Sequence, residues 1–245
     1  MTSKNIIQLK NVARYYEMGE NIVKALDCVD IAIEKGDFVA IMGPSGSGKS
    51  TSMNLTGSLD YATKGDIYLD GENIEEMTES ELAQIRGKKI GFIFQQFNLI
   101  PNLTAKENVM LPMLFQGEEK EEREEKAEEL LRLVDLGDRM DFYPNQLSGG
   151  QQQRVAIARA LSNDPEVILA DEPTGNLDTK TGEMVLDFLT KLNEQGKTII
   201  IVTHDPNLAK GHAGIIYSIR DGRVESVEKK VNGKWKKHRS YKCEN

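Results

Sequence analysis

The 245-residue sequence predicts an α/β fold with a mainly parallel sheet and an antiparallel sheet at the N-terminus. Three observations support this prediction. The first third of the chain has strand-like segments, the second half alternates strands with helices, and an apolar strand leads into a glycine-rich loop at residues 43–50. The composition is that of a globular protein, since 39% of the residues are hydrophobic and 29% are charged.

The first strands follow from runs of apolar and β-branched residues. A Lys35-Gly36 turn separates two of them, and Asp70-Gly71 is a hairpin-type turn signal at the end of another. The expected strands are residues 6–16, 21–34, 37–42, 66–71 and 89–94.

The helices are predicted where capping boxes stand, because each box satisfies two backbone amides that lack a helical partner. Thr78 with Glu81 forms one box and Thr104 with Glu107 forms another. The charged segment 118–134 favours a solvated helix with i,i+4 ion pairs. The chain then alternates helix 150–162, strand 166–171, helix 179–195 and strand 197–204, and a hairpin follows at 215–227.

The charge of the chain limits its partners. A net charge of −8 argues against a general nucleic-acid binder. From Lys229 onward there are seven Lys or Arg residues against Glu244 alone, so a basic tail is expected. No apolar run approaches the roughly 20 residues that span a bilayer, and we expect any membrane role to come through a partner.

The two cysteines, Cys28 and Cys243, stand in unlike contexts without a CxxC pattern. Neither a disulfide framework nor a zinc site is expected, which favours a reducing compartment.

Residues 43–50, GPSGSGKS, fit the pattern G-x-x-x-x-G-K-[ST] between a predicted strand and a segment that can be helical. The glycines allow backbone amides to converge on phosphate oxygens, and the helix adds the positive end of its dipole. We expect Lys49 to reach the β- and γ-phosphates and Ser50 to bind Mg²⁺. The alternative is a flexible Gly/Ser turn.

Residues 167–173, VILADEP, run from apolar side chains into the paired carboxylates Asp171 and Glu172. Ligand sites in open parallel sheets lie at the carboxyl ends of the strands. Successive strand residues point in opposite directions, so the two carboxylates have different tasks. Asp171 suits a metal ligand, and Glu172 suits a base that takes a proton from an attacking water. The alternative is a pair of solvated turn residues.

Residues 147–154, LSGGQQQR, place Ser148, Gly149 and Gly150 at the start of a helix rich in Ala and Ile. This is a second helix N-terminus able to bind an anion, about a hundred residues from the first. In isolation, an ordinary glycine-rich helix start explains it equally well.

Together these segments resemble the ATP-binding cassette (ABC) ATPases over roughly residues 6–228. Segments 94–109, 147–161 and 170–178 are most similar to the LolD/MacB/FtsE subfamily, whose ATPases drive membrane permeases. The resemblance implies a P-loop NTPase (RecA-like) core with an N-terminal antiparallel β-subdomain and an inserted helical subdomain. The expected domains are an ABC ATPase domain at 1–228, with its core at about 1–95 and 161–228 and its helical subdomain at about 96–160, and a basic tail at 229–245.

The resemblance also implies roles for single residues. Tyr16 matches the aromatic residue that stacks on adenine, although Tyr15 is a rival and sheet core is an alternative. Gln95 matches the glutamine that contacts the metal and the attacking water and senses the transport partner, or it is a solvated loop residue. Asp178 matches the residue that couples two ATP sites, and it can also cap the helix at 179–195, since the two roles are compatible. His204 matches the histidine at the γ-phosphate, or it is structural.

The candidates fall into three groups. The catalytic candidates are Glu172, His204, Lys49 and Gln95. The metal ligands are Ser50, Gln95 and Asp171. The nucleotide contacts are Tyr16, Gly43, Ser45, Gly46, Ser47, Gly48, Lys49, Ser50, Thr51, Ser148, Gly149, Gly150, Gln151 and Asp178.

The implied function is the ATP-binding and ATP-hydrolysing subunit of an ABC transporter, with ATP and Mg²⁺ as cofactors. In this family two chains form an ATP-dependent, head-to-tail homodimer, in which residues 148–151 of one chain close over the nucleotide of the other. The dimer is expected on the cytoplasmic face of the cell membrane, where it drives an integral membrane permease of an export or lipoprotein/peptide extrusion type.

Two other functions remain open. One is a nucleotide-gated scaffold that assembles a membrane complex with little transport. The other is a soluble ABC protein that works on DNA or ribosomes, which the single cassette and the absence of a heptad coiled coil disfavour.

The permease contact is expected at residues 97–103, which follow Gln95. Phe97, Leu99, Ile100 and Leu103 are apolar in a segment that would be polar if it were only a solvated connection. The alternative is that all four side chains fold back into the helical subdomain.

Overall fold

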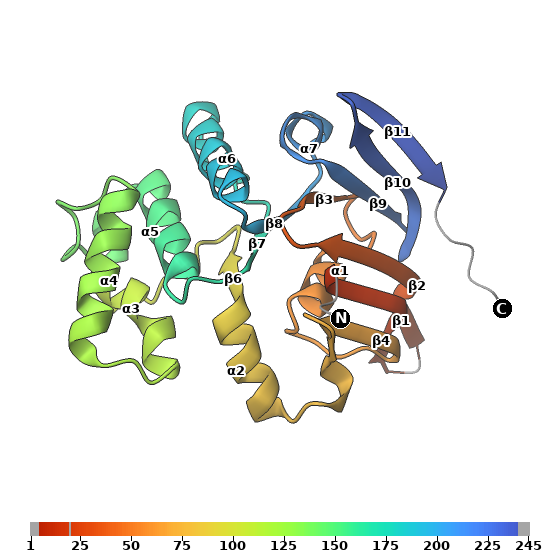
Figure 1. The fold of residues 1–245 in the computed structure, drawn as a ribbon, viewed down its shortest axis with the longest axis horizontal. Coiled ribbons are helices and arrows are strands. Elements are labelled where there is room, and N and C mark those ends of the chain that lie inside the picture. The colour runs from red at the N-terminus through yellow and green to blue at the C-terminus, as the bar shows by residue number, and fades with distance from the viewer. Residues whose placement is uncertain (1–4, 20, 240–245) are drawn as a thin grey trace. The chain divides into compact units, whose positions relative to one another are not determined.

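In the computed structural model, which describes residues 5–19 and 21–239, residues 83–192 (unit 2) are inserted into a unit built from both ends of the chain (unit 1). Unit 1 comprises residues 1–82 and 193–245. Helix α2 (Glu79–Lys89) leads into unit 2, and helix α6 (Thr179–Glu194) leads back (Figure 1).

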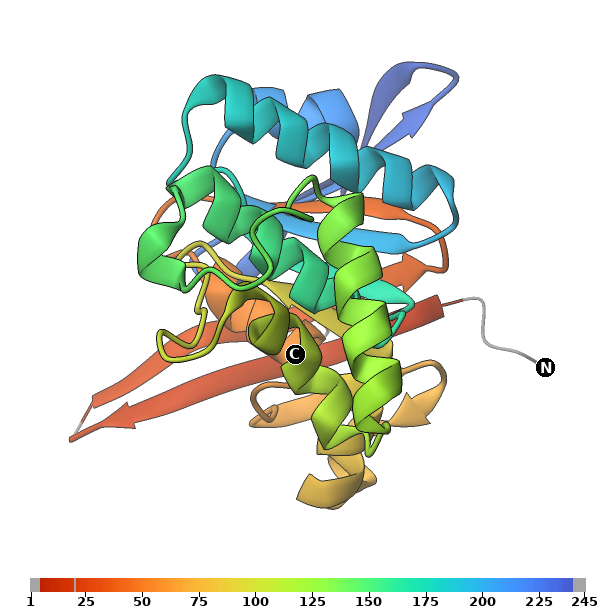
Figure 2. The same cartoon turned by 90° about the vertical axis from the view of Figure 1, so that its left-hand side faces the viewer.

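The N-terminal strands of unit 1 form the predicted antiparallel sheet, with the order β2-β1-β4-β5. Strands β1 and β2 form a long hairpin (Figure 2). The turn after β4 contains Asp70 and Gly71 at φ +52° and +86°, as a tight hairpin turn requires. The strands are β1 (Asn5–Met18), β2 (Asn21–Glu34), β4 (Lys64–Leu69) and β5 (Glu72–Asn73).

A second sheet of unit 1 contains the predicted parallel core. Strand β3 (Phe38–Met42) lies between β8 (Thr198–Thr203) and β9 (Ile215–Arg220) and is parallel to both. Every residue of β8 is buried, as is typical of a central parallel strand. Two further antiparallel strands, β10 (Arg223–Val231) and β11 (Lys234–Arg239), extend this sheet beyond β9.

Unit 1 also contains helix α1 (Lys49–Thr56), the 3₁₀ turn η1 (Ile74–Glu76) and helix α7 (Pro206–His212). Helix α1 begins directly after the glycine-rich loop, as expected. Helix α7 was not expected, although its start carries a sequence signal. The Asp205 side chain accepts hydrogen bonds from the amides of Asn207 and Leu208, and Pro206 occupies the first helical position.

Unit 2 combines two parallel strands with a group of helices. Helices α3, α4 and α5 pack on one another (Figures 1 and 2), and each carries buried apolar side chains, among them Val109, Met113, Leu131 and Val155. Both predicted capping boxes are confirmed, at Thr104 for α3 and at Thr78 for α2. The elements are β6 (Ile90–Ile93), β7 (Val167–Asp171), α3 (Ala105–Phe115), α4 (Lys120–Leu133), the 3₁₀ turn η2 (Pro144–Gln146) and α5 (Gly149–Leu161).

The C-terminal segment differs from the expected basic tail. Residues 229–239 belong to β10, a turn and β11, while residues 240–245 lie outside the described residues. Asn232 and Gly233 form the turn at φ +50° and +74°. An Asn-Gly pair between strand-like segments is a strong hairpin signal, and the high charge of the segment masked it.

The structure corrects the expectation for Cys28, which is disulfide-bonded, while Cys243 lies outside the described residues. Within residues 5–19 and 21–239, no helix is both long and apolar enough to cross a bilayer.

Candidate functional site

The glycine-rich loop of residues 43–50 joins β3 to α1 in unit 1, and its shape depends on glycine. Gly46 and Gly48 take φ values of +76° and +101°, which L side chains rarely adopt. A Cβ atom on Gly43 would lie 2.5 Å from Ser47 Oγ, and one on Gly48 would lie 2.8 Å from Leu26 Cδ2. The same two Cβ atoms would also meet the backbone oxygens of Ile219 and Ala25, so the loop has no room for larger residues at these two points.

The N-terminus of α1 is open to a ligand. Its N-cap is Gly48, so no side chain caps the first amides. Lys49 is only 8% exposed and its Nζ donates to Pro44 O at 2.8 Å, which folds the ammonium group back over the loop. The buried Ser47 Oγ has no hydrogen-bond partner among the described residues. These unsatisfied donors and the ammonium charge fit phosphate oxygens.

His204 lies at the same edge of the sheet as the start of this loop. Met42 and Thr203 are paired in the parallel ladder of β3 and β8, and Gly43 and His204 are the residues that follow them. His204 is exposed. Its position at the carboxyl end of a parallel strand is the place where ligands bind in α/β sheets.

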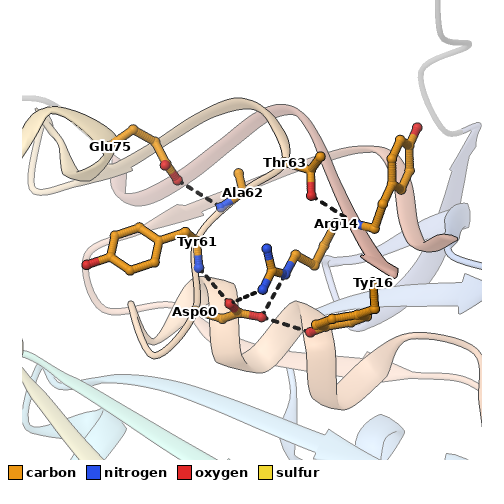
Figure 3. A network of polar contacts seen from close by, with 8 residues as sticks. Arg14, Tyr16, Asp60, Tyr61, Ala62, Thr63 and Glu75 are labelled. Carbon is orange, nitrogen blue, oxygen red and sulfur yellow. Dashed lines mark hydrogen bonds and ion pairs between the residues drawn. The ribbon is translucent and has the colours of Figure 1, made fainter. Parts of the chain in front are cut away.

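The two adjacent tyrosines of β1 make different contacts. Tyr16 Oη donates to Asp60 Oδ2 at 2.8 Å, and the Arg14 guanidinium lies 4.6 Å from the ring centroid (Figure 3). Tyr15 Oη donates to Asp27 Oδ1 at 2.6 Å. This hydrogen bond lowers the pKa of Asp27 and raises the pKa of Tyr15.

In unit 2, Asp171 ends β7 and Glu172 follows it at φ +42°. The left-handed conformation turns the chain sharply after the strand. The next residues bring the segment of Gln95 close, since Asn176 Nδ2 donates to Gln95 O at 2.7 Å. Gly175 N donates to Glu172 O at 2.9 Å, and a Cβ atom on Gly175 would lie 3.0 Å from Gln95 Nε2. The candidate base and the candidate glutamine therefore belong to one local structure.

Helix α5 begins at Ser148 with a complete capping box. Ser148 Oγ accepts from Gln151 N at 3.3 Å, and Gln151 Oε1 accepts from Ser148 N at 2.9 Å. The helix start lies against α6, because a Cβ atom on Gly150 would lie 2.7 Å from Thr181 Cγ2. Two candidate segments of unit 2 are thus in contact.

Asp178 caps α6, which confirms one of its two interpretations. Its carboxylate accepts from Thr181 N at 3.0 Å and from Thr181 Oγ1 at 2.7 Å. These hydrogen bonds lower the pKa of Asp178. Thr181 therefore contacts both the Asp178 cap and the start of α5.

The candidate metal ligands are all oxygen donors, a hydroxyl from Ser50, an amide oxygen from Gln95 and a carboxylate from Asp171. Oxygen ligands with one carboxylate suit Mg²⁺, which keeps several waters and binds substrate phosphates. The described residues contain no cluster of three or more His, Cys, Asp and Glu side chains of the kind that holds a transition metal. The chemistry of the donor set therefore fits Mg²⁺ bound together with a nucleotide.

A profile of the ABC transporter family matches residues 26–175. The chain is also 53% identical over 227 residues to an uncharacterized ABC transporter ATP-binding protein of Thermotoga maritima, across 93% of this chain and 97% of that protein. The chain belongs to the ABC transporter family. It is an ABC ATPase with ATP as its nucleotide, and the predicted family and fold are confirmed.

Two further relatives extend this comparison. The ABC ATPase is 52% identical to the macrolide export ATP-binding/permease protein MacB of Aggregatibacter actinomycetemcomitans, over 92% of this chain and 35% of MacB. It is also similar to a dimeric, post-hydrolysis structure of the ATP-binding cassette MJ0796 of Methanocaldococcus jannaschii, bound to ADP and Pi. That match has a TM-score of 0.85 and 53% identity and covers 91% of this chain and 98% of the other.

Two residues of the ABC ATPase that sequence reasoning missed hold the segment after Gln95. Arg159 on α5 donates to the carbonyls of Phe97 and Asn98 at 2.7 and 2.5 Å, and both of these residues have positive φ. Burial lowers the pKa of Arg159, and the two carbonyls compensate its charge. The fully buried Asn108 accepts from Ile100 N at 2.8 Å and donates to three carbonyls at residues 100–104. An arginine on a helix rich in Ala and Ile is the only sequence signal for these contacts.

Proposed function

We propose that this ABC ATPase hydrolyses ATP with Mg²⁺ in a head-to-tail homodimer and thereby drives a membrane permease. The candidate residues are the phosphate-binding loop, Tyr16 and His204 in unit 1, and Asp171, Glu172 and Gln95 in unit 2. The observation that supports this most directly is the open N-terminus of α1. Its uncapped amides, the buried Ser47 hydroxyl and the folded-back Lys49 form a set of donors that suits an anion.

The chemistry follows from the residues at the strand ends. Glu172 would accept a proton from the attacking water, and Gln95, whose carbonyl accepts a hydrogen bond from Asn176, would orient that water. Lys49 would stay on the β- and γ-phosphate oxygens and neutralise charge that develops there. His204 would contact the γ-phosphate from the edge of the sheet. Mg²⁺, when bound, supplies further charge neutralisation on the same phosphates.

The dimer is supported by the second helix N-terminus. The Ser148 end of α5 belongs to unit 2, and a chain with two anion-binding helix starts can share them between two nucleotides if two copies associate. Each ATP would then contact the phosphate-binding loop of one chain and the start of α5 of the other. ATP would therefore stabilise the dimer by mass action. The dimeric MJ0796 structure, at 53% identity, supports a dimer of this chain.

The permease contact would include the segment 97–103. None of its four apolar side chains is fully buried, and Ile100 is 39% exposed. The name of the MacB relative describes one protein with both ATP-binding and permease functions. This supports a membrane permease as the partner of this chain. Binding to a permease would place the ATPase on the cytoplasmic face of the membrane, where ATP is available.

The test is the Glu172→Gln variant, which keeps the shape of the side chain but removes the base. We expect ATP turnover to fall by a factor on the order of 10² or more, with ATP binding retained. Size-exclusion chromatography with saturating ATP should then show a dimer that accumulates. Wild-type turnover by this variant, or a monomer at saturating ATP, would contradict the proposed base and the proposed dimer.

A further inference from the structure

Tyr16 is fixed at its hydroxyl and at its ring by two side chains (Figure 3). Asp60 Oδ2 accepts from Tyr16 Oη at 2.8 Å and from Arg14 Nε at 2.9 Å. Asp60 Oδ1 pairs with a second guanidinium nitrogen of Arg14 at 2.7 Å. The side chains of Arg14 and Asp60 are only 25% and 19% exposed, so water competes little for these contacts. The ring cannot turn or swing away without breaking at least one of them.

Asp60 is in turn attached to helix α1. Leu59 N donates to Asn54 O at 2.8 Å, which closes the end of the helix onto the segment that contains Asp60. On the other side, Thr63 N donates to Ala13 O at 2.7 Å and ties the segment to β1. The carboxylate that holds Tyr16 therefore lies on a segment that is fixed at both ends.

We propose that Arg14 and Asp60 are positioning residues that hold Tyr16 as a preformed platform for adenine. The proposal rests on the proposed function, in which Tyr16 stacks on the base. Arg14 covers one face of the ring, so the base stacks on the opposite face. Because α1 begins at Lys49, one short helix joins the phosphate-binding loop to the segment that holds the platform. A preformed platform removes the entropy cost of ordering the ring when ATP binds.

The Tyr15 cluster has the same chemistry and provides a matched control. Tyr15 Oη donates to Asp27 at 2.6 Å, and Asp27 also accepts from Arg223 at 2.6 Å. The ring of Tyr15 lies near two cations, Lys24 at 5.4 Å and Lys64 at 5.9 Å. Tyr15 and Tyr16 are successive strand residues and point to opposite faces of the sheet. Only the Tyr16 cluster is part of the proposed base platform.

The experiment compares Asp60→Asn, Arg14→Met and Tyr16→Leu with Asp27→Asn in the full chain. Dissociation constants for ATP and ADP are measured by titration, and KM and kcat are measured by ATP turnover. Inorganic triphosphate, which has no base, serves as a competitor that tests the phosphate site alone. Thermal unfolding checks that each variant is folded.

We expect Asp60→Asn and Arg14→Met to raise the dissociation constants of ATP and ADP by the same factor, about two- to tenfold. KM should rise with them, whereas kcat and inhibition by triphosphate should stay constant, since the base contact contributes equally to substrate and transition state. Loss of the stacking ring in Tyr16→Leu should cost roughly 5- to 150-fold in affinity. In the Tyr16→Leu background, Asp60→Asn should add nothing, because Asp60 acts through the ring.

Three results would overturn the proposal. They are an Asp27→Asn variant that weakens ATP as much as Asp60→Asn, an additive effect of Asp60→Asn in the Tyr16→Leu background, and a fall in kcat at unchanged KM. If Asp60→Asn does not fold, Arg14→Met and Tyr16→Phe test the same prediction through the other contacts. Failure of the proposed function is a separate outcome, since wild-type protein would then neither bind ATP nor respond to triphosphate.

Discussion

Helices α1 and α5 both present an N-terminus that suits an anion, yet the two ends are built differently. Helix α1 has Gly48 as its N-cap, in a left-handed conformation, and no side chain occupies its first amides. Helix α5 has Ser148 as its N-cap, and the reciprocal bonds with Gln151 satisfy two backbone donors within the chain. One helix end therefore leaves its first amides open to a ligand, and the other satisfies two of its amides within the chain.

This difference agrees with the separate roles proposed for the two ends. An end that must bind phosphate in the monomer gains affinity when its donors are open and preformed. A helix end that contacts a nucleotide only in the dimer must also be folded in the monomer. A capping box stabilises it there. The predictions below test this difference, from the largest expected effect to the smallest.

Alanine at the two glycines of these helix starts should have opposite consequences. In Gly48→Ala the left-handed backbone alone costs about 1–3 kcal/mol, and the new Cβ also meets Leu26. We expect ATP binding by the monomer to be lost or the loop to unfold locally. In Gly149→Ala the Cβ meets only Phe97 Cζ, at an ordinary 3.8 Å, so monomer stability should be kept or raised by up to about 1 kcal/mol.

The measurements are nucleotide titration and thermal unfolding of both variants. Equal losses of ATP affinity in the two monomers would mean that the helix ends do not differ as proposed.

A bulky cation at the second helix end should prevent association without harming the first end. Ser148→Arg should leave ATP affinity of the isolated monomer nearly unchanged, since the proposed contact of the segment 148–151 is with the nucleotide of the partner chain. ATP-driven dimerisation should be abolished, because a large side chain cannot fit between the segment 148–151 and a nucleotide of the partner. Sizing with ATP measures the dimer and titration measures the affinity. An equal loss of monomer affinity would place Ser148 in the pocket of its own chain.

A charged side chain in the segment 97–103 should uncouple the ATPase from its permease while the protein stays folded. In Ile100→Glu the new carboxylate enters a position that is 39% exposed, so folding should be kept. ATP turnover of the isolated subunit should be near the wild-type value, while stimulation by the permease in reconstituted membranes should fall. Glu121 on the exposed side of α4 offers a control site, where Glu121→Gln should change neither rate. An unfolded Ile100→Glu protein would assign the residue to the core, and intact coupling would place the contact elsewhere.

Local patterns predicted much of this molecule because the interactions behind them are local. The capping boxes at Thr78 and Thr104, the glycine-rich loop and the turn at Asp70 each depend on residues within a few positions of one another. The tight fit of Gly43 and Gly48 is the physical reason why this loop has a recognisable pattern.

What could not be predicted depends on residues far apart in the chain. Arg159 reaches carbonyls that lie 61 and 62 positions away, and Asn176 reaches a carbonyl 81 positions away. The contact between Gly150 and Thr181 likewise exists only because α5 and α6 pack together. Helix α7 and strand β11 are different, since the Asp205-Pro206 and Asn232-Gly233 signals are present in the sequence and were outweighed by the composition around them.

The smallest effect comes from removing the cap of α5 without adding bulk. Ser148→Ala should lower the free energy of unfolding by about 1 kcal/mol, which for a chain of this size lowers Tm by about 2–4 °C. Thr104→Ala is the matched control, because Thr104 forms the same box with Glu107 at the start of α3. Both variants should lose similar stability in thermal unfolding, yet only Ser148→Ala should weaken the ATP-dependent dimer, since only its hydroxyl lies at the proposed interface. A dimer weakened equally by Thr104→Ala would show that the loss follows from stability alone, and the capped end of α5 would then have no special role in association.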